Sequence, residues 1–409
     1  MIVIAFTGGG TGGHIYPGLA VIARLTQLFG SRGLPGYRIV WLGANTGMDR
    51  SLVEAGGLEF FGIPSGRLRR YFSLKTIPDM FRVLGGFLAA RSILKKLKPA
   101  LLFSKGGFVS VPPCAAAASL GIPVFTHESD FSPGLATRIN LRFVARTKGR
   151  IFTAYAETAA FLAPAYRGMV TVSGNPVRPA FRAGSDAGSA AALAAAGRAF
   201  LGLGPDEQVL LVLGGSQGAR EINDLVKDAL PELTKYYTVV HQTGPDKDGD
   251  LRPGGRYKPY PYIGEEMPQV LAAAALVLGR SGAGTVWESA ALGKPMVLIP
   301  LRGSGTRGDQ VENARFFQEA GAAVMLLPQA IEDAGGADAA RGAAAGSDTI
   351  APAELVRVIR DLAVNREKLA AMAGAAANIG RTDGAAVIAE AIAEAIGAAA
   401  RVSPRAAPA

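Results

Sequence analysis

Short apolar runs alternate along the chain with longer stretches whose apolar residues recur every three or four positions. The first run, residues 2–6, precedes a glycine-rich loop and a helical pattern over 17–28. After residue 205 the rhythm restarts with an apolar run at 209–213, another glycine-rich loop and a helical pattern over 221–230. Such alternation predicts α/β structure with parallel sheets wound on both faces, and the restart predicts two domains of this kind.

The length of the chain agrees with two domains, because 409 residues exceed what one compact core usually carries. The pattern breaks between residues 174 and 204, where Pro176, Pro179 and an alanine-rich stretch interrupt it. We therefore predict an N-terminal domain over residues 1–177 and a C-terminal domain over 178–384. Two doubly wound domains would place their ligand-binding ends face to face across a central cleft.

Composition excludes several classes of protein. A hydrophobic content of 49% and a charged content of 19% exclude a disordered chain. The single cysteine, Cys114, excludes a disulfide scaffold and a cysteine-based zinc site. No apolar run approaches the roughly 18–20 residues that span a bilayer, and residues 1–6 resemble a first strand rather than a signal peptide. We expect a cytosolic chain unless something holds it to a surface.

Each predicted domain opens with a glycine-rich turn between its first strand and first helix. In the first turn, Gly8, Gly10 and Gly13 fit the dinucleotide fingerprint, but the second strand ends at Asn45 without the carboxylate that would hold a ribose. NAD(P) binding is therefore disfavoured. Five glycines and a threonine ahead of a helix favour an anion held by backbone N–H groups. The turn at 214–218 repeats the arrangement.

The three histidines each follow a predicted strand at its carboxyl end. His14 lies on the first glycine turn, and imidazole is suited to proton abstraction near neutral pH, so we favour a chemical role for this residue. His127, next to Glu128, is about equally compatible with a chemical and a structural role. We predict a structural role for His241.

A motif in the second domain, residues 279–288, is typical of a strand end, a glycine turn and a helix start. Amides at that helix start would hold a diphosphate, and Glu288 could accept two hydrogen bonds from a ribose diol.

The acidic run at 246–250 superficially resembles a metal loop, but it lacks the glycine and the final glutamate of an EF-hand. We interpret it as a surface loop and predict no metal site.

Positive charge is concentrated in the first half of the chain. Residues 1–175 carry 20 Lys and Arg against 7 Asp and Glu, whereas the remainder carries 23 against 26. Between residues 63 and 98, nine basic residues are interleaved with apolar side chains, which favours an anionic membrane surface as partner. For residues 81–97 an ordinary crossover helix is the stronger interpretation. No binding motif for nucleic acid accompanies the charge. The predicted membrane contacts are Leu68, Arg69, Arg70, Tyr71, Phe72, Lys75 and Phe81.

A series of motifs resembles the bacterial peptidoglycan glycosyltransferase family MurG, in that family's order. The motifs lie at residues 9–14 with 17–20, 106–110, 127–128, 174–178, 214–219, 280–288, and 309–310 with 313–314. The resemblance implies a GT-B fold of two Rossmann-like domains, with a C-terminal helix near residues 385–400 returning to the first domain. It also implies transfer of N-acetylglucosamine from UDP-GlcNAc to undecaprenyl-diphosphate-linked muramyl-pentapeptide (lipid I to lipid II), at the cytoplasmic face of the inner (plasma) membrane and without a cofactor.

The resemblance also assigns roles to individual residues. For the donor, the expected contacts are Ile263 and Arg178 to uracil, Glu288 to ribose, Ser216, Ala283, Gly284 and Thr285 to the diphosphate, Gln310 and Asn313 to the sugar, and Thr11, Gly12 and Gly13 from the first domain. The acceptor diphosphate is expected near Gly9, Gly10, Gly106 and Gly107.

Three positions depart from the family pattern. Asp130 stands where the family usually has the asparagine that contacts the N-acetyl group, and an ionised carboxylate accepts hydrogen bonds but cannot donate them. Donor sugar selectivity is therefore open. Phe108 stands where some members have tyrosine, so no hydroxyl is available there, and Trp287 is bulkier than the residues common at its position.

These assignments predict an inverting transfer in which the muramyl 4-hydroxyl displaces UDP. His14 is the expected general base, and Glu128 is a weaker candidate for orienting or assisting. Two alternatives stay open: another enzyme on this fold, such as a UDP-GlcNAc 2-epimerase or a UDP-sugar transferase to a different lipid, and a non-catalytic nucleotide-sugar-binding subunit.

Overall fold

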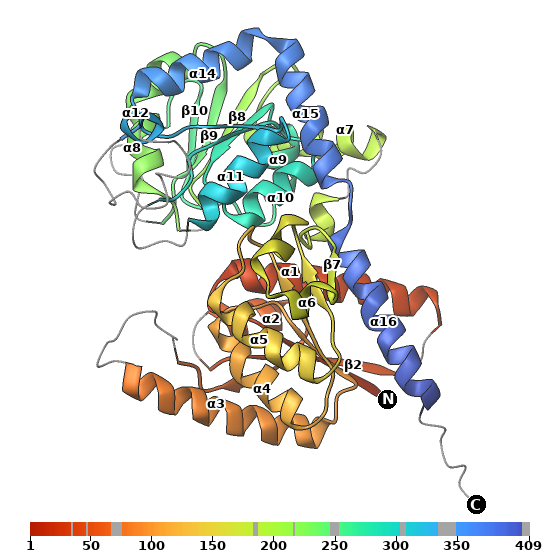
Figure 1. Ribbon diagram of the computed structural model, residues 1–409. Coiled ribbons are helices and arrows are strands. Elements are labelled where there is room, and N and C mark those ends of the chain that lie inside the picture. The colour runs from red at the N-terminus through yellow and green to blue at the C-terminus, as the bar shows by residue number, and fades with distance from the viewer. Residues whose placement is uncertain are drawn as a thin grey trace, which may run out of the picture. The chain divides into compact units, whose positions relative to one another are not determined.

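The computed structural model describes residues 1–33, 36–45, 48–66, 76–182, 187–215, 217–245, 253–302, 308–333 and 349–402. The chain divides into two compact units, Met1–Arg178 with Thr382–Ala409 (unit 1) and Pro179–Arg381 (unit 2) (Figure 1). The division lies one residue beyond the boundary expected from the sequence, and the final helix belongs to unit 1.

Unit 1 is a seven-stranded parallel sheet with helices on both faces. Its strands are β1 (Ile2–Thr7), β2 (Tyr37–Ala44), β3 (Glu59–Ile63), β4 (Leu101–Ser104), β5 (Val124–Glu128), β6 (Ile151–Thr153) and β7 (Val170–Val172), in the order β3-β2-β1-β4-β5-β6-β7. Its helices are α1 (Gly12–Ser31), α2 (Met48–Ala55), α3 (Thr76–Leu97), α4 (Val111–Ser119), α5 (Leu135–Arg146), α6 (Pro164–Arg167) and α16 (Gly384–Val402). The order reverses between β1 and β4, which makes the carboxyl ends of these strands the usual ligand-binding position.

The pleat of β1 explains how the sheet is covered. Ile4 and Phe6 point to the face where α1 and α16 pack, whereas Ala5 points to the face covered by α3, α4 and α5. Ile388 and Ile392 of α16 are fully buried in the first of these clusters. An ion pair of 2.8 Å between Arg24 and Asp383 also joins α1 to the start of α16. Apolar burial therefore fixes the last helix on unit 1.

Unit 2 is a six-stranded parallel sheet of the same kind. Its strands are β8 (Val209–Leu213), β9 (Thr238–Gln242), β10 (Tyr257–Tyr260), β11 (Leu276–Gly279), β12 (Met296–Leu298) and β13 (Ala323–Met325), in the order β10-β9-β8-β11-β12-β13. Its helices are α7 (Ala187–Leu201), α8 (Arg220–Leu233), α9 (Met267–Ala273), α10 (Ala283–Ala291), α11 (Asp309–Glu319), α12 (Gln329–Asp333), α14 (Pro352–Val364) and α15 (Arg366–Gly380). Leu210 and Val212 of β8 pack under α8 and α14. The predicted pair of doubly wound parallel sheets is confirmed.

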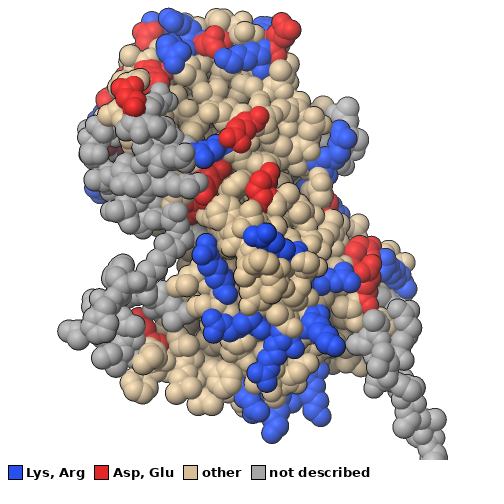
Figure 2. Space-filling model, viewed as in Figure 1, with Lys and Arg blue, Asp and Glu red and all other residues tan. Residues whose placement is uncertain are grey.

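The surface of unit 1 carries the excess of positive charge that the sequence indicates. Figure 2 shows Lys and Arg outnumbering Asp and Glu on the visible face of this unit. Helix α3 exposes a row of large apolar side chains: Met80, Phe81, Leu84 and Leu88 are 55–69% exposed. Within the described residues, we find no helix that is both long enough and apolar enough to cross a membrane.

Candidate active site

In unit 1 the first glycine turn is fixed by a carboxylate from a neighbouring loop. Asp49, at the start of α2, is buried and accepts hydrogen bonds from the backbone N–H of Gly10 (3.0 and 3.2 Å) and of Ala44 (3.3 Å). Burial raises the pKa of Asp49, against the two backbone hydrogen bonds, which lower it. A Cβ on Gly9 would collide with this carboxylate, so glycine is required for its close approach. The N–H of Gly10 is therefore committed to Asp49.

His14 lies in the first turn of α1, where this glycine turn ends. Its Nδ1 is 2.9 Å from Oγ1 of Thr11, the residue before the helix. When Nδ1–H donates to Thr11, Nε2 is the unprotonated ring nitrogen and can accept a proton. The ring of His14 also borders the loop after β4, because a Cβ built on Gly107 would be 3.3 Å from its Cγ and Nδ1. The structure thus brings His14 together with Thr11 and Gly107.

The loop after β4 can approach His14 because two of its glycines adopt left-handed backbone angles. Gly106 has φ +88° and Gly107 has φ +77°. A side chain at Gly107 would collide with the carbonyl oxygen of Gly9, so the two glycine turns touch through their backbones. Gly10, with φ +86°, faces the ring of Phe108. All four glycines expected near the acceptor diphosphate therefore lie at the adjoining ends of β1 and β4.

Two buried basic side chains lie behind these turns. Lys105 directly follows β4, is 2% exposed, and donates to Oγ of Ser129 at 2.6 Å. Burial lowers the pKa of Lys105 to about 8, although the nearby carboxylates of Glu128 and Asp130 act to raise it. His127 is buried in β5 with its Nε2 3.1 Å from the carbonyl oxygen of Gly174. Burial, reinforced by the charge of Lys105, lowers the pKa of His127 well below its usual value, so this imidazole is neutral at pH 7.

Glu128 uses both carboxylate oxygens to shape the loop after β5. One oxygen accepts from the N–H of Ser129 (3.0 Å) and Asp130 (3.2 Å), and the other accepts from the N–H of Gly134 (2.9 Å). Gly134 is the residue before α5, so Glu128 ties the strand end to the helix start. This arrangement orients the backbone around Asp130, which is partly exposed.

Arg178, the last residue of the first segment of unit 1, stacks on an aromatic ring of α1. Its guanidinium carbon lies 4.6 Å from the ring centroid of Tyr16, two residues beyond His14. Thr11 and Gly13 are exposed and Gly12 is partly exposed. The unit 1 residues expected at the donor therefore surround the beginning of α1, apart from Asp130 after β5.

In unit 2 the motif after β11 forms the predicted turn and helix. Val286 donates the first intrahelical bond of α10 to the carbonyl of Gly282, so the amides of Ala283, Gly284 and Thr285 precede that bond. Such amides, with the helix dipole, favour a bound anion. Glu288 lies in the second turn of α10 and is partly exposed.

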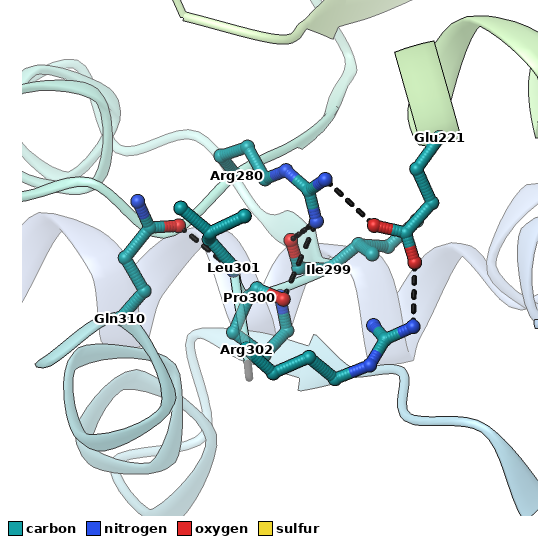
Figure 3. Close-up of polar contacts among 7 residues, drawn as sticks. All are labelled: Glu221, Arg280, Ile299, Pro300, Leu301, Arg302 and Gln310. Atoms are coloured by element: carbon teal, nitrogen blue, oxygen red, sulfur yellow. Dashed lines mark hydrogen bonds and ion pairs between the residues drawn. The ribbon is translucent and has the colours of Figure 1, made fainter. Parts of the chain in front are cut away.

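Arg280, which begins this motif, joins three elements of unit 2 (Figure 3). Its guanidinium donates to Glu221 of α8 at 2.6 Å and to the carbonyl oxygens of Ile299 and Pro300 after β12, at 3.1 and 3.3 Å. Arg302 donates to the other oxygen of Glu221 at 2.6 Å. Burial opposes ionisation of Glu221, but the two guanidinium groups outweigh it and lower the pKa of this carboxyl. The network fixes the ends of β11 and β12 to the helix that follows the second glycine turn.

The remaining donor residues of unit 2 are held by backbone contacts. The N–H of Ile263 donates to Oε1 of Gln242 at 2.9 Å, and the amide of Gln242 donates to the carbonyl of Gly215 at 3.3 Å. Gln310 accepts from the N–H of Leu301 at 3.0 Å (Figure 3), and the buried Asn313 donates to the carbonyl of Ser281 at 3.1 Å. The end of β9 and the loops after β8, β10, β11 and β12 thus converge at one edge of this sheet.

Three further predictions concern other parts of the chain. His241 is buried with its nitrogens 3.1 Å from Tyr257 and Asn223, and burial lowers its pKa to about 4, as a structural histidine requires. Among the described residues no three His, Cys, Asp or Glu side chains group as metal ligands. Ser216 and the run 246–250, which we interpret as a surface loop, lie outside the described residues. So do the predicted membrane contacts Leu68, Arg69, Arg70, Tyr71, Phe72 and Lys75; Phe81 is described and is 69% exposed.

Comparison with known families defines the class of this protein. The glycosyltransferase family 28 N-terminal domain matches residues 4–148, and the glycosyltransferase family 28 C-terminal domain matches residues 209–334. A UDP-N-acetylglucosamine–N-acetylmuramyl-(pentapeptide) pyrophosphoryl-undecaprenol N-acetylglucosamine transferase of Treponema denticola is 45% identical over 95% of this chain and 97% of its own length. The corresponding protein of Treponema pallidum is 47% identical over 80% of this chain and 83% of its own length.

Solved structures agree on the fold. The MurG of Acinetobacter baumannii superposes with a TM-score of 0.69 at 23% identity, covering 96% of this chain and 100% of that one. A UDP-GlcNAc 2-epimerase of Neisseria meningitidis gives a TM-score of 0.63 at 14% identity, with coverage of 96% and 100%. The chain is a glycosyltransferase and belongs to the family of MurG transferases within glycosyltransferase family 28.

Several residues of the site did not emerge from sequence reasoning. Asp49 and Glu221 lie outside every glycine motif, and only their contacts with Gly10 and Arg280 reveal them. Lys105 could have been noticed as a charged residue placed directly between a buried strand and a glycine pair. Arg280 lies within a motif that the sequence does single out, but its partners are distant in the chain.

Proposed function

We propose that this chain transfers N-acetylglucosamine from UDP-GlcNAc to the 4-hydroxyl of undecaprenyl-diphosphate-linked N-acetylmuramyl-pentapeptide, converting lipid I to lipid II in peptidoglycan synthesis. The observation that carries the proposal is 45% identity over 95% of the chain to a transferase named for this reaction, of which the match covers 97%. A match over nearly both full lengths covers both domains rather than one alone.

The edge of unit 2 supplies the features that a UDP-sugar requires. The amides of Ala283, Gly284 and Thr285 precede the first intrahelical bond of α10 and would take the diphosphate, with Ser216 as a further contact. Glu288 would hold the ribose, and the backbone of Ile263, fixed by Gln242, would read uracil with Arg178. Gln310 and Asn313 would address the sugar hydroxyls. These amides would also stabilise the departing UDP, where negative charge develops.

His14 of unit 1 would act as the general base. In the tautomer with Nδ1–H donated to Thr11, Nε2 takes the proton of the muramyl 4-hydroxyl as the oxygen attacks the anomeric carbon. The bond from that carbon to the diphosphate oxygen breaks, its electron pair leaves with UDP, and one displacement inverts the anomeric configuration. Glu128 would orient the Asp130 loop, since its two oxygens accept three backbone N–H groups.

The acceptor diphosphate would lie at the glycine turns after β1 and β4. The backbones of Gly9 and Gly107 meet there next to His14, and the left-handed angles of Gly106 and Gly107 allow this close approach. Gly107 is partly exposed, whereas Gly106 is buried. The N–H of Gly10 is committed to Asp49, so Gly10 would contribute by its shape rather than as a donor.

The lipid part of the acceptor calls for a membrane surface, and we propose peripheral attachment at the cytoplasmic face of the inner (plasma) membrane. The exposed apolar row of α3 and the net positive charge of unit 1 support this. Replacing Phe81 and Leu84 by serine should reduce co-sedimentation with vesicles containing anionic lipid. The exposed Val364 of unit 2, replaced by serine, is the matched control. Binding that is indifferent to both the apolar row and the lipid charge would contradict the attachment.

Product analysis tests the function itself. The purified chain is incubated with UDP-GlcNAc and lipid I, and the expected products are lipid II and UDP in equal amounts, with none formed when lipid I is omitted. Conversion of UDP-GlcNAc alone to its 2-epimer would instead identify an epimerase. Binding of UDP-GlcNAc with no turnover in the presence of lipid I would identify a non-catalytic subunit.

A further inference from the structure

Lys105 is a buried cation that the proposed chemistry does not use. It lies between β4 and the Gly106–Gly107 turn, and its Cβ is 3.2 Å from where a Cβ on Gly8 would be. The residue is 2% exposed and, within the described part of the chain, its ammonium donates one hydrogen bond, to Ser129. A buried lysine is rare unless a partner or ligand compensates its charge.

The hydrogen bond of Lys105 continues into a chain across three strand ends. Ser129 donates in turn to Oδ1 of Asn175 at 2.7 Å, and Asn175 is 1% exposed. The chain therefore links the loop after β4, which carries the glycine pair, to the loops after β5 and β7. These loops surround the end of the sheet where His14 lies.

The charges around Lys105 indicate what its ammonium does. Glu128 and Asp130 bring two carboxylates to the end of β5, beside the place proposed for a substrate that carries a diphosphate. A further titratable group next to it, His127, is neutral at pH 7. Without Lys105 the negative charges of Glu128 and Asp130 would face an anionic substrate with one buried cation fewer to offset them.

Resting on the proposed function, we propose that Lys105 is a positioning residue for the acceptor, whose buried ammonium offsets Glu128 and Asp130 and so lets the acceptor diphosphate approach the glycine turns beside His14. The residue acts through charge and through the Ser129–Asn175 chain rather than by touching the reacting atoms. Its pKa near 8 means that this compensation is present at pH 7 and is lost as the pH rises above 8.

The first test separates acceptor binding from the rest of the reaction. K105M keeps a side chain of similar length without the charge, and in detergent we expect it to raise KM for lipid I about tenfold with a smaller change in kcat. The affinity for UDP, measured by calorimetry, should stay within about twofold because the proposed UDP site lies in unit 2. K95M makes the same charge change on the exposed face of α3 and should leave KM unchanged.

A second variant distinguishes charge compensation from a merely structural role. D130N removes one of the opposing carboxylates, so K105M/D130N should recover part of the acceptor KM that K105M loses. In the wild type, KM for lipid I should rise above pH 8, whereas in K105M it should be flat over that range. The penalty of K105M should also be larger for lipid I than for an analogue with one phosphate.

The results of these tests distinguish failure of the Lys105 inference from failure of the proposed transferase function. If the wild type converts lipid I but K105M has a normal acceptor KM, or if D130N gives no recovery in the K105M background, Lys105 does not compensate charge and the inference is wrong. If K105M does not fold, the wild type decides the matter: its KM should rise above pH 8 for lipid I and rise less for the one-phosphate analogue. If the wild type forms no lipid II at all, the proposed function fails instead.

Discussion

The two glycine turns each follow the first strand of their sheet, but the charged groups near them differ. In unit 1 the turn after β1 is tied to an acid, because Asp49 accepts the N–H of Gly10 and Ala44. In unit 2 the helix after the corresponding turn of β8 begins next to a pair of cations, since Glu221 is bound by Arg280 and Arg302. The same strand–turn–helix arrangement therefore has different charged neighbours in the two units.

The difference matches what each turn would have to do. In unit 1 the N–H of Gly10 is bound to Asp49, which holds the backbone of the turn in place. The turn then presents the side chain of His14 to a substrate. An edge that is rich in arginine and helix-start amides favours the negative charge of a departing diphosphate. We infer that unit 1 is organised to place a base beside the acceptor and unit 2 to bind the UDP of the donor. Four substitutions probe this contrast, from the largest expected effect to the smallest.

The largest effect is expected for His14→Ala. Loss of a general base should lower kcat for lipid II formation by about 10²–10⁴-fold. The affinity for UDP and the melting temperature should be preserved, because the side chain is partly exposed and the proposed UDP site lies in unit 2. Near-normal transfer by this variant would exclude His14 as the base. Thr11→Val, which removes only the tautomer-fixing partner, should cost less.

Arg280→Ala should act on the donor side of the comparison. It removes a charge-assisted bond to Glu221 and the two contacts with the carbonyl groups after β12, so we expect UDP affinity to fall about 10–100-fold. Calorimetric titration with UDP measures this. Arg357→Ala is the control, because that side chain is 64% exposed and pairs with Glu354 at only 3.9 Å. Equal effects of the two variants would refute a specific role for Arg280.

Asp49→Asn should weaken unit 1 itself. The amide group would direct N–H donors at backbone N–H groups, and a buried unsatisfied donor costs about 1–3 kcal/mol of unfolding free energy. Denaturant unfolding gives the loss. Glu54→Gln, which breaks the exposed 2.7 Å pair with Arg50, should cost less than about 1 kcal/mol. A smaller loss for Asp49→Asn than for Glu54→Gln would show that the carboxylate does not hold the turn.

Asp130→Asn should have the smallest effect. An asparagine can both donate to and accept from the acetamide group, so kcat/KM for UDP-GlcNAc should rise about 2–10-fold, the size of one hydrogen bond. Competition with UDP-glucose, which lacks the acetamide, supplies the control within the same assay. An equal change for both donors would mean that Asp130 does not read the N-acetyl group.

The sequence by itself determined the two-domain α/β architecture and the positions of the glycine turns. Apolar periodicity indicates which face of a strand or helix is buried, and a run of glycines indicates where one backbone segment approaches another. Both can be read from residues that are close together in the sequence. The motif at 279–288 therefore predicted the turn and the helix start of α10 correctly. A structural role for His241 was also predicted, because a lone histidine is more often structural than catalytic. Its partners Tyr257 and Asn223, 16 and 18 positions away, came only from the tertiary structure.

Only the tertiary structure decided which side chains meet. Asp49 reaches Gly10 across 39 positions, and Glu221 reaches Arg280 across 59, because strand order brings distant loops to one sheet edge. The three backbone contacts of Glu128 and the burial of Lys105 likewise depend on how the loops after β4, β5 and β7 pack. The sequence pattern does not predict these contacts, because they depend on the order of the strands in the sheet and on loop packing. Neither of these is determined by the residues next to each partner in the chain.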